Sequence, residues 1–286
     1  MRVLQTIEQV RQALGPAKRA GRRVGFVPTM GALHDGHWSL VDLARRTCDA
    51  VVVSIFVNPL QFGPTEDLDA YPRALDRDLT GCEQRGCDIV FTPSPREMYP
   101  GHTLAGVVVR RLSEPLCGRI RKGHFEGVAT VVCKLLNIVL PDAAFFGEKD
   151  FQQLVIIRRM VHDLDMPVEI VACPTVREPD GLAVSSRNVY LDPAQRLQAV
   201  SISAALREVA DAVKRGARDV RSLITAAERR ITEAGAADIE YIEIVDPDTL
   251  EAVEVIERPA RMCVAARFGT ARLIDNMALD VGGGAG

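Results

Sequence analysis

The feature that most constrains the fold of this sequence is the stretch VGFVPTMGALHDGHWSLVDL at residues 24–43. Its opening apolar run, Val24–Val27, predicts a short strand. Pro28, Met30 and a glycine then break the strand pattern, and from Leu40 onward apolar residues recur at helical spacing. The stretch therefore predicts a strand, a glycine-containing loop and a helix in that order.

Two of the five histidines in the chain, His34 and His37, lie at the predicted start of this helix. A helix N-terminus presents free backbone N–H groups and a partial positive charge, both of which favour phosphate. Residues three apart share one helix face, so two imidazole donors would lie beside these amides. We expect a site for the phosphates of ATP. The alternative is that both histidines are ordinary surface residues.

Composition limits the class of protein. The 286 residues suggest about two domains, and a net charge of −3 gives no basic excess for nucleic acid as a main partner. No apolar run approaches the ~18 residues that span a membrane, and the N-terminus reads as an amphipathic helix, not a signal peptide. Seven cysteines without a Cys-x-x-Cys pair predict reduced thiols and a cytoplasmic location, and argue against structural zinc.

Strands and helices are predicted to alternate through residues 1–174. The segment 50–57 is apolar on both faces, as is typical of a parallel strand covered by helices. The expected strands are 24–27, 50–57, 88–92, 143–146 and 168–172, with a weaker candidate at 107–112, and further helices are expected at 1–20, 76–85, 124–140 and 151–163. This alternation predicts an α/β domain, a doubly wound, Rossmann-like parallel sheet.

The pattern changes after Pro174. Two amphipathic helices, 193–215 and 219–234, precede a segment at 239–245 that alternates apolar and charged residues. The segment 261–265 alternates less cleanly, and 271–274 follows it. Period-two alternation predicts antiparallel strands with one solvated face. We expect residues 175–286 to form a smaller α+β lid domain, with a disordered VGGGAG tail.

Polar side chains follow several of the predicted strands. Gln61 lies in the loop after the second strand, and Lys149 with Asp150 follows the strand 143–146. Ligands in doubly wound folds bind at the carboxyl ends of strands, so we expect one pocket to collect these side chains and the two histidines. The alternatives are a solvated loop amide for Gln61 and a surface ion pair for Lys149.

A polar loop precedes the helix at 193–215. Ser185, Ser186 and Arg187 place two hydroxyls and a guanidinium together, which suits the charge that builds on departing pyrophosphate. A loop between domains can also close over ATP and exclude water. The alternative is a hydrophilic linker. Gln153, on the first turn of the helix at 151–163, is placed to donate to a carboxylate or a hydroxyl.

Six motifs in order resemble one enzyme family over nearly the whole chain. His-x-Gly-His alone is similar to the signature of the nucleotidylyltransferases and class I synthetases, but the combination resembles the pantoate–β-alanine ligases, also called pantothenate synthetases. The motifs are PTMGALHDGH at 28–37, FVNPLQFG at 56–63, DLDAYPR at 67–73, GHFEGVATVV at 123–132, FFGEKDFQQL at 145–154 and DGLAVSSRN at 180–188.

The resemblance implies an ATP-dependent, AMP-forming carbon–nitrogen ligase of pantothenate biosynthesis. Pantoate attacks the α-phosphate of ATP to give pantoyl adenylate and pyrophosphate, and the amine of β-alanine then releases AMP. It further implies Mg²⁺ as a cofactor and a homodimer, but it transfers no metal ligands.

The same resemblance assigns roles residue by residue. Gln61 and Gln153 would hold the polar groups of pantoate beside Met30, and Asp150 would lie near the ribose or the phosphates. Pro28, Met30 and Gly147 would shape the ATP pocket. The groups implied to bind the phosphates or stabilise the transition state are His34, His37, Lys149, Ser185, Ser186 and Arg187.

Four places depart from the family pattern: Trp38, Arg121-Lys122-Gly123, Glu126 and Val184. Glu126 stands where relatives often have Arg, so no role for an arginine carries over to it. Trp38, the chain's single tryptophan, replaces a more usual aliphatic residue, and we expect it to serve packing.

Three rival functions remain open. An adenylyltransferase acting on a phosphate ester would share the two histidines but has no need of Gln61 and Gln153. A class I aminoacyl-tRNA synthetase fits a short, slightly acidic chain poorly. A non-catalytic nucleotide-binding protein is disfavoured by the complete donor set, and ATP binding without AMP formation would support it.

Overall fold

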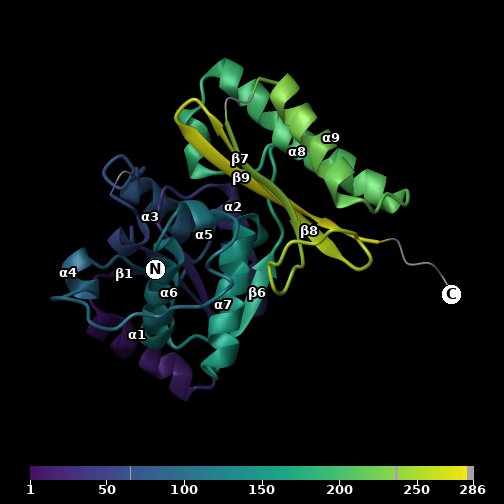
Figure 1. The fold of residues 1–286 in the computed structure, drawn as a ribbon. Helices are drawn as coiled ribbons and strands as arrows, with labels where there is room; N and C mark the ends of the chain where they lie inside the picture. The colour runs from purple at the N-terminus through teal and green to yellow at the C-terminus, as the bar shows by residue number, and fades with distance from the viewer. Residues whose placement is uncertain (65, 236–237, 282–286) are drawn as a thin grey trace. The chain divides into compact units, whose positions relative to one another are not determined.

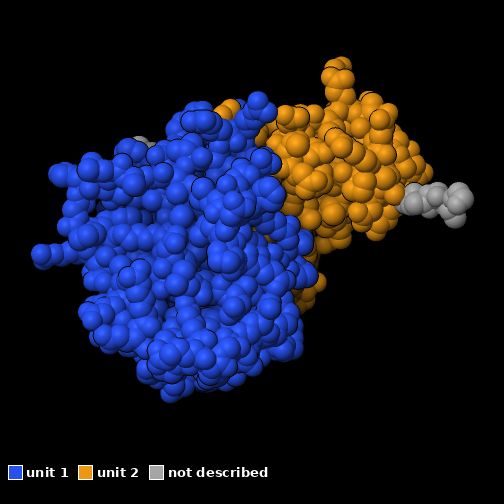
Figure 2. All heavy atoms as spheres, turned by 90° about the horizontal axis from the view of Figure 1, so that it is seen from below, with its two compact units in different colours: residues 1–113, 118–148, 156–174 blue, residues 114–117, 149–155, 175–286 orange. Residues whose placement is uncertain are grey.

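The computed structural model describes residues 1–64, 66–235 and 238–281 (Figure 1). The chain forms two compact units, each considered by itself (Figure 2). Unit 1 comprises residues 1–113, 118–148 and 156–174, and unit 2 comprises residues 114–117, 149–155 and 175–286. Domains with a boundary at residue 174 stay a prediction. Most of the VGGGAG tail, residues 282–286, lies outside the described residues.

Unit 1 contains the predicted parallel sheet, whose six strands run in the order β1-β4-β3-β2-β5-β6. Every neighbouring pair is parallel, which confirms the Rossmann-like fold class. The strands are β1 (Arg2–Leu4), β2 (Val24–Thr29), β3 (Ala50–Ile55), β4 (Ile89–Phe91), β5 (Ala143–Gly147) and β6 (Glu169–Cys173).

Helices connect these strands, as the alternation predicts. The helix at residues 35–47 packs against β2, β3 and β5, and the helix at residues 124–139 packs against β2. The latter carries ten buried residues because apolar side chains surround most of it. The helices are α1 (Ile7–Arg19), α2 (Asp35–Thr47), α3 (Leu75–Gln84), α4 (Pro95–Met98), α5 (Cys117–Ile120), α6 (His124–Val139) and α7 (Phe151–Asp163), with short turns η1 (Pro59–Gln61) and η2 (Glu148–Asp150). No helix in the described ranges is long and apolar enough to cross a membrane.

Strand β2 runs further than its sequence predicts. It continues through Pro28 to Thr29, and Pro28 is in register with Ser54 of β3. A proline lacks the N–H that a central strand normally donates. The β2–β5 register covers only Gly25 and Phe26, so Pro28 lies beyond the part of β2 that pairs on that side.

The prediction of one helix over residues 1–20 is wrong at its start. Arg2–Leu4 forms β1, an edge strand parallel to β4, and the Arg2 amide donates to the Asp88 carbonyl at 2.9 Å. The helix begins after Thr6 because Thr6 and Gln9 form a capping box: each side chain accepts from the other's backbone N–H, at 3.2 and 3.1 Å.

The strand candidate at 107–112 is also wrong. The Val107 amide donates to the Thr130 hydroxyl at 2.9 Å, not to a neighbouring strand. The chain then turns at Arg111, whose φ of 64° lies in the left-handed region that strands do not use. Local apolar composition therefore does not make a strand here.

Unit 2 contains the predicted antiparallel strands, in the order β7-β8-β9. Helix α8 (Pro193–Lys214) begins at a capping box between Asp192 and Gln195, and α9 is Val220–Glu233. The apolar faces of both helices and one face of the sheet form a single buried cluster. The strands are β7 (Asp238–Val245), β8 (Ala260–Phe268) and β9 (Ala271–Leu279), and a short turn, η3 (Ser186–Tyr190), precedes α8.

The packing around β2 predicts that Gly25 is intolerant of a side chain. A Cβ at Gly25 would lie 2.9 Å from the Cys48 sulfur and 3.2 Å from the Phe145 ring. We expect Gly25→Ala to lower the free energy of unfolding by about 1–3 kcal/mol, the usual cost of overpacking a core. Urea unfolding measures this. Gly101→Ala, which would meet nothing within 4 Å, is the control and should change stability by less than about 0.5 kcal/mol. Equal stabilities of the two variants would contradict the packing argument.

Candidate active site

The loop from β2 into α2 places the two predicted histidines together. His34 is the N-cap of α2, and the His34 and His37 ring centroids lie 4.1 Å apart. The His34 backbone N–H donates to His37 Nδ1 at 3.4 Å. A neutral His37 that accepts at Nδ1 carries its proton on Nε2, so Nε2–H is a donor. The structure thus places this imidazole donor at a helix N-terminus, an arrangement that favours an anion. That the anion is a phosphate of ATP stays a prediction.

A buried carboxylate fixes the loop that leads to His34. Asp78, on α3, is 1% exposed and accepts from the backbone N–H groups of Ala32 and Leu33, both at 2.8 Å. Gly31 has a φ of 87°, and a Cβ there would lie 3.2 Å from the carboxylate. Burial raises the pKa of Asp78, and the two amide donors act against that rise. Sequence reasoning assigned no role to Asp78, because nothing local indicates its partners 45 and 46 residues away.

Gln61 is 8% exposed, which excludes the alternative of a solvated loop amide. Its Nε2 lies 3.0 Å from the Met30 sulfur, so two residues implied to bind pantoate are in contact. Turn η1 also approaches α6 closely at Gly127, where a Cβ would lie 2.2 Å from the Leu60 carbonyl oxygen. Because Gly127 has no side chain, the turn that carries Gln61 can lie this close to α6.

A second buried amide holds the Gln61 side chain. Asn58 is 1% exposed, and its Nδ2 donates to Gln61 Oε1 at 3.2 Å and to the Gly127 carbonyl at 3.1 Å. Its Oδ1 accepts from the Tyr99 hydroxyl at 2.8 Å. Burial raises the pKa of Tyr99 to about 12, so this hydroxyl stays a donor at neutral pH. The sequence motif contained Asn58, but its distant partners were not predictable.

The backbone of Gln61 is held by a charged group that sequence reasoning left without a role. The Gln61 carbonyl lies 2.8 Å from His124 Nδ1 and 3.3 Å from the Arg121 guanidinium. Arg121 forms an ion pair with Glu66 at 2.5 Å, with side-chain exposures of 14% and 23%. Burial alone would raise the pKa of Glu66, but the hydrogen bond and charge of Arg121 outweigh it, and the pKa is lowered.

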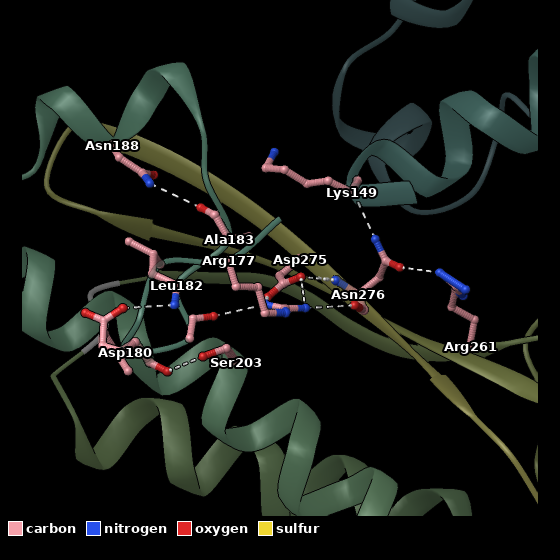
Figure 3. A network of polar contacts seen from close by, with 12 residues as sticks. Lys149, Arg177, Asp180, Leu182, Ala183, Asn188, Ser203, Arg261, Asp275 and Asn276 are labelled. Atoms are coloured by element: carbon pink, nitrogen blue, oxygen red, sulfur yellow. Dashed lines mark hydrogen bonds and ion pairs between the residues drawn. The ribbon is translucent and has the colours of Figure 1, made fainter. Parts of the chain in front are cut away.

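In unit 2, Lys149 lies in η2 and its side chain is 19% exposed. Its Nζ is 4.0 Å from Asp150 Oδ1, whose side chain is 52% exposed, so this contact is a weak ion pair. The Lys149 carbonyl accepts from Asn276 Nδ2 at 2.9 Å (Figure 3). Lys149 therefore has a fixed backbone and a mostly covered side chain, unlike a freely solvated surface lysine.

Ser185 and Lys149 line one hollow of unit 2, together with Asn188 and Asp275. Ser185 caps η3, and its Oγ accepts from the Arg187 backbone N–H at 3.3 Å. Ser186 and Arg187 belong to the same short turn and are partly exposed. The structure thus brings Lys149 and Ser185 to one hollow. That Lys149, Ser185, Ser186 and Arg187 donate to one anion stays a prediction.

The remaining predicted residues occupy defined positions in their own units. Pro28 and Gly147 belong to β2 and β5 of unit 1, and Gly147 ends its strand. Gln153 lies in the first turn of α7, within unit 2. Its neighbour Gln152 is buried and structural: it accepts from the Cys117 amide and donates to the Pro115 carbonyl. That residues of the two units act on one substrate stays a prediction.

Trp38 serves packing, as its sequence position predicts. It is 9% exposed, a Cβ at Gly81 would lie 2.5 Å from its ring, and the Arg85 guanidinium stacks 4.4 Å from the ring centre.

Metal ligands are not preassembled in the described part of the chain. It contains no group of three or more His, Cys, Asp or Glu side chains able to hold a metal ion. Mg²⁺ often keeps several waters and takes other ligands from substrate phosphates, with one or two carboxylates at most. Asp150 is the one carboxylate among the predicted site residues, and its Oδ1 lies 4.0 Å from Lys149 Nζ.

The Glu66–Arg121 pair predicts a pH dependence of stability. Because the folded-state pKa of Glu66 lies below 4.5, the pair stabilises the fold above that pH and loses this contribution as pH falls through the folded-state pKa. We expect the stability difference between wild type and Glu66→Gln to be largest near neutral pH and to shrink below pH 4.5. Urea unfolding across this range measures it, with the exposed Glu83→Gln as control. A difference that stays constant with pH would contradict the role of the pair.

Comparisons with known proteins point to one enzyme family. The family model described as pantoate-beta-alanine ligase matches residues 2–278. Pantothenate synthetase 1 of Bradyrhizobium diazoefficiens is 51% identical over 280 residues, 98% of each chain. The pantothenate synthetase of Acetivibrio thermocellus is 50% identical over 281 residues, 98% of this chain and all of that protein.

Solved structures give the same result. A crystal structure of pantothenate synthetase from Thermus thermophilus has a TM-score of 0.92 and 47% identity, and covers 97% of this chain and 99% of that one. A pantoate-beta-alanine ligase from Francisella tularensis, complexed with beta-gamma ATP and beta-alanine, has a TM-score of 0.82 and 34% identity over 97% of each chain. Similarity of this extent in sequence and fold shows that the chain belongs to the pantoate–β-alanine ligase family.

Proposed function

We propose that this protein condenses pantoate with β-alanine at the expense of ATP, through a pantoyl adenylate. The observation that carries the proposal is the pairing of His34 and His37 at the N-terminus of α2, within a chain of this family. ATP and β-alanine are the kinds of ligand present in the Francisella tularensis relative. Pantoate completes the reaction for which the family is described.

The first step joins a carboxylate to a triphosphate. A pantoate oxygen bonds to the α-phosphorus, the bond from that phosphorus to the bridging oxygen breaks, and pyrophosphate leaves with the electron pair. Negative charges meet in this transition state, so positioned donors supply most of the catalysis. We assign this role to His34, His37, Lys149, Ser185, Ser186 and Arg187, with Pro28, Met30 and Gly147 shaping the nucleotide pocket and Asp150 near the ribose or phosphates.

The second step transfers the acyl group. The β-alanine amine attacks the carbonyl carbon of the adenylate, the bond from that carbon to the phosphate oxygen breaks, and AMP leaves while the amine loses a proton. The acyl group is already activated as a mixed anhydride, so no protein nucleophile is required. Donors that held the α-phosphate in the first step stabilise AMP as the leaving group in the second.

Pantoate binding is assigned to Gln61, Met30 and Gln153. In the structure Gln61 Nε2 faces the Met30 sulfur, which is a weak hydrogen-bond acceptor. A substrate carboxylate or hydroxyl oxygen is a much better acceptor, so the Gln61 donor can turn to it at little cost. Asn58 holds the other end of the Gln61 amide and keeps the donor directed.

Three accompanying features belong to the same proposal. Mg²⁺, carried by the ATP phosphates, would neutralise charge on the triphosphate. A homodimer is expected from the family resemblance. A cytoplasmic location is supported by the seven cysteines, all of which are free thiols in the structure.

Product analysis of the purified protein tests the proposal. With ATP and Mg²⁺, we expect AMP and pantothenate only when pantoate and β-alanine are both present, and about one pyrophosphate per site with pantoate alone. Turnover with a phosphate ester instead of pantoate would support the wider adenylyltransferase group. ATP binding without AMP formation would support a non-catalytic protein. Loss of turnover on Mg²⁺ chelation, restored by added Mg²⁺, tests the cofactor.

The histidine pair gives a sharper prediction. His34→Ala and His37→Ala should each lower the rate of adenylate formation by roughly 10²–10³-fold, as removal of a preorganised transition-state donor does elsewhere. Pre-steady-state pyrophosphate release measures this rate. Ser39→Ala is the matched control in the same helix turn, because the Ser39 hydroxyl donates to the Gly36 carbonyl at 2.8 Å and has no role in the proposed reaction. A wild-type rate in either histidine variant, shown to be folded, would remove that residue from the donor set.

A further inference from the structure

We infer that Asn276, a residue of β9, positions Lys149 for adenylate formation. It thereby links Lys149 to the loop of Ser185–Arg187. The inference rests on the function proposed above, in which Lys149 and Ser185–Arg187 donate to the ATP phosphates. Asn276 itself touches no reacting atom in this account. It acts through the backbone of Lys149.

Both polar atoms of the Asn276 side chain have a hydrogen-bond partner. Asn276 is 5% exposed, its Nδ2 donates to the Lys149 carbonyl at 2.9 Å, and its Oδ1 accepts from the Arg261 guanidinium at 2.7 Å (Figure 3). A carbonyl can only accept and a guanidinium can only donate, so this pair of neighbours fixes the orientation of the amide. Asn276 therefore holds one defined geometry.

Arg261, which donates to the Asn276 side chain, also contacts the chain just after the turn that contains Lys149. The Arg261 guanidinium stacks 4.1 Å from the centre of the Phe151 ring, and Phe151 lies two residues after Lys149. Asn276 and Arg261 therefore contact the two chain neighbours of Asp150: Asn276 binds the Lys149 carbonyl, and Arg261 stacks on Phe151. A three-residue 3₁₀ turn such as η2 is weakly stable by itself, so contacts from outside must set its position.

The preceding residue of β9 holds the other phosphate-binding segment. Asp275 is 4% exposed and accepts two hydrogen bonds from Arg177, at 2.6 and 3.0 Å. Arg177 also donates to the Gly181 carbonyl at 3.1 Å, inside the tight hairpin that leads directly to Ser185. Bidentate Arg–carboxylate pairs are geometrically specific, so the Arg177–Asp275 pair fixes the position of the hairpin in addition to neutralising the buried carboxylate.

The two consecutive residues are linked to each other as well. The Asn276 backbone N–H donates to Asp275 Oδ1 at 2.8 Å. Asp275, Lys149 and Ser185 line the same hollow. One dipeptide of β9 therefore sets the spacing between Lys149 and the loop of Ser185, which a site for one polyphosphate must hold constant.

Variants at Asn276 and Lys149 test the inference through single-turnover pyrophosphate release with pantoate. Asn276→Ala should slow this step on the order of 10-fold or more, because small misplacement of a catalytic group is costly. Asn276→Asp should slow it similarly, since a carboxylate keeps the acceptor for Arg261 but cannot donate to the Lys149 carbonyl. In a Lys149→Ala background, Asn276→Ala should cause little further loss, because the two residues act as one unit.

Glu240→Gln is the matched structural control. Glu240, a residue of β7, pairs with Arg267 and Arg272 at 2.9 and 2.7 Å in the same antiparallel sheet. We expect this variant to lower thermal stability while its pyrophosphate release stays at the wild-type rate. A purely structural role for Asn276 would make its variants behave like Glu240→Gln.

The outcomes separate the inference from the proposed function. Normal pyrophosphate release in folded Asn276→Ala, with loss in Lys149→Ala, would overturn the inference alone. Losses that multiply in the double variant would also overturn it, because Asn276 would then act independently of Lys149. No pyrophosphate release from the wild type with pantoate would overturn the proposed function and the inference with it.

Discussion

The parallel pairing of β2 between β3 and β5 is the constraint on which the chemistry of unit 1 depends. Parallel strands place their carboxyl ends at one edge of the sheet, and Thr29 and Ile55 are in register there. The loops after β2 and β3 carry His34 and Gln61, and β5 ends at Gly147. An antiparallel neighbour would have sent one of these loops to the opposite edge. The parallel direction of the strands therefore determines that the loops with His34 and Gln61 lie at the same edge of the sheet.

Buried polar groups then convert these loops into fixed structures. Asp78 holds the amides before His34, Asn58 holds the Gln61 side chain, and His124 contacts the Gln61 carbonyl. In unit 2 the dipeptide at 275 and 276 does the same for Lys149. Such groups are costly to bury and are retained when their hydrogen bonds are satisfied. The proposed reaction uses no protein nucleophile and depends on donors set in advance, and we propose that these anchors hold them in place.

The sequence predicted those elements whose signal is local. Helix α7 has the predicted bounds, 151–163, and the three C-terminal strands are present, although β8 and β9 run on to Phe268 and Leu279. The expected solvated face is wrong for β8, whose residues 262–266 are all buried. The predictions of a helix over residues 1–20 and a strand over 107–112 were wrong. A three-residue edge strand and an irregular apolar loop have no distinctive hydrophobic period. The histidines and Lys149 were found from motifs, whereas Asp78, Asn58 and Asn276 act through partners far along the chain. Contacts of that kind require the fold.

In the proposed first step, a carboxylate of pantoate attacks the α-phosphorus of ATP. Pantoate labelled with ¹⁸O in its carboxylate tests this directly, with mass spectrometry of the nucleotide product after turnover with β-alanine. The account predicts one ¹⁸O in AMP, because the oxygen that bonds to phosphorus leaves with the phosphate when the amine attacks the acyl carbon. Unlabelled AMP, or label in inorganic phosphate released together with ADP, would contradict it.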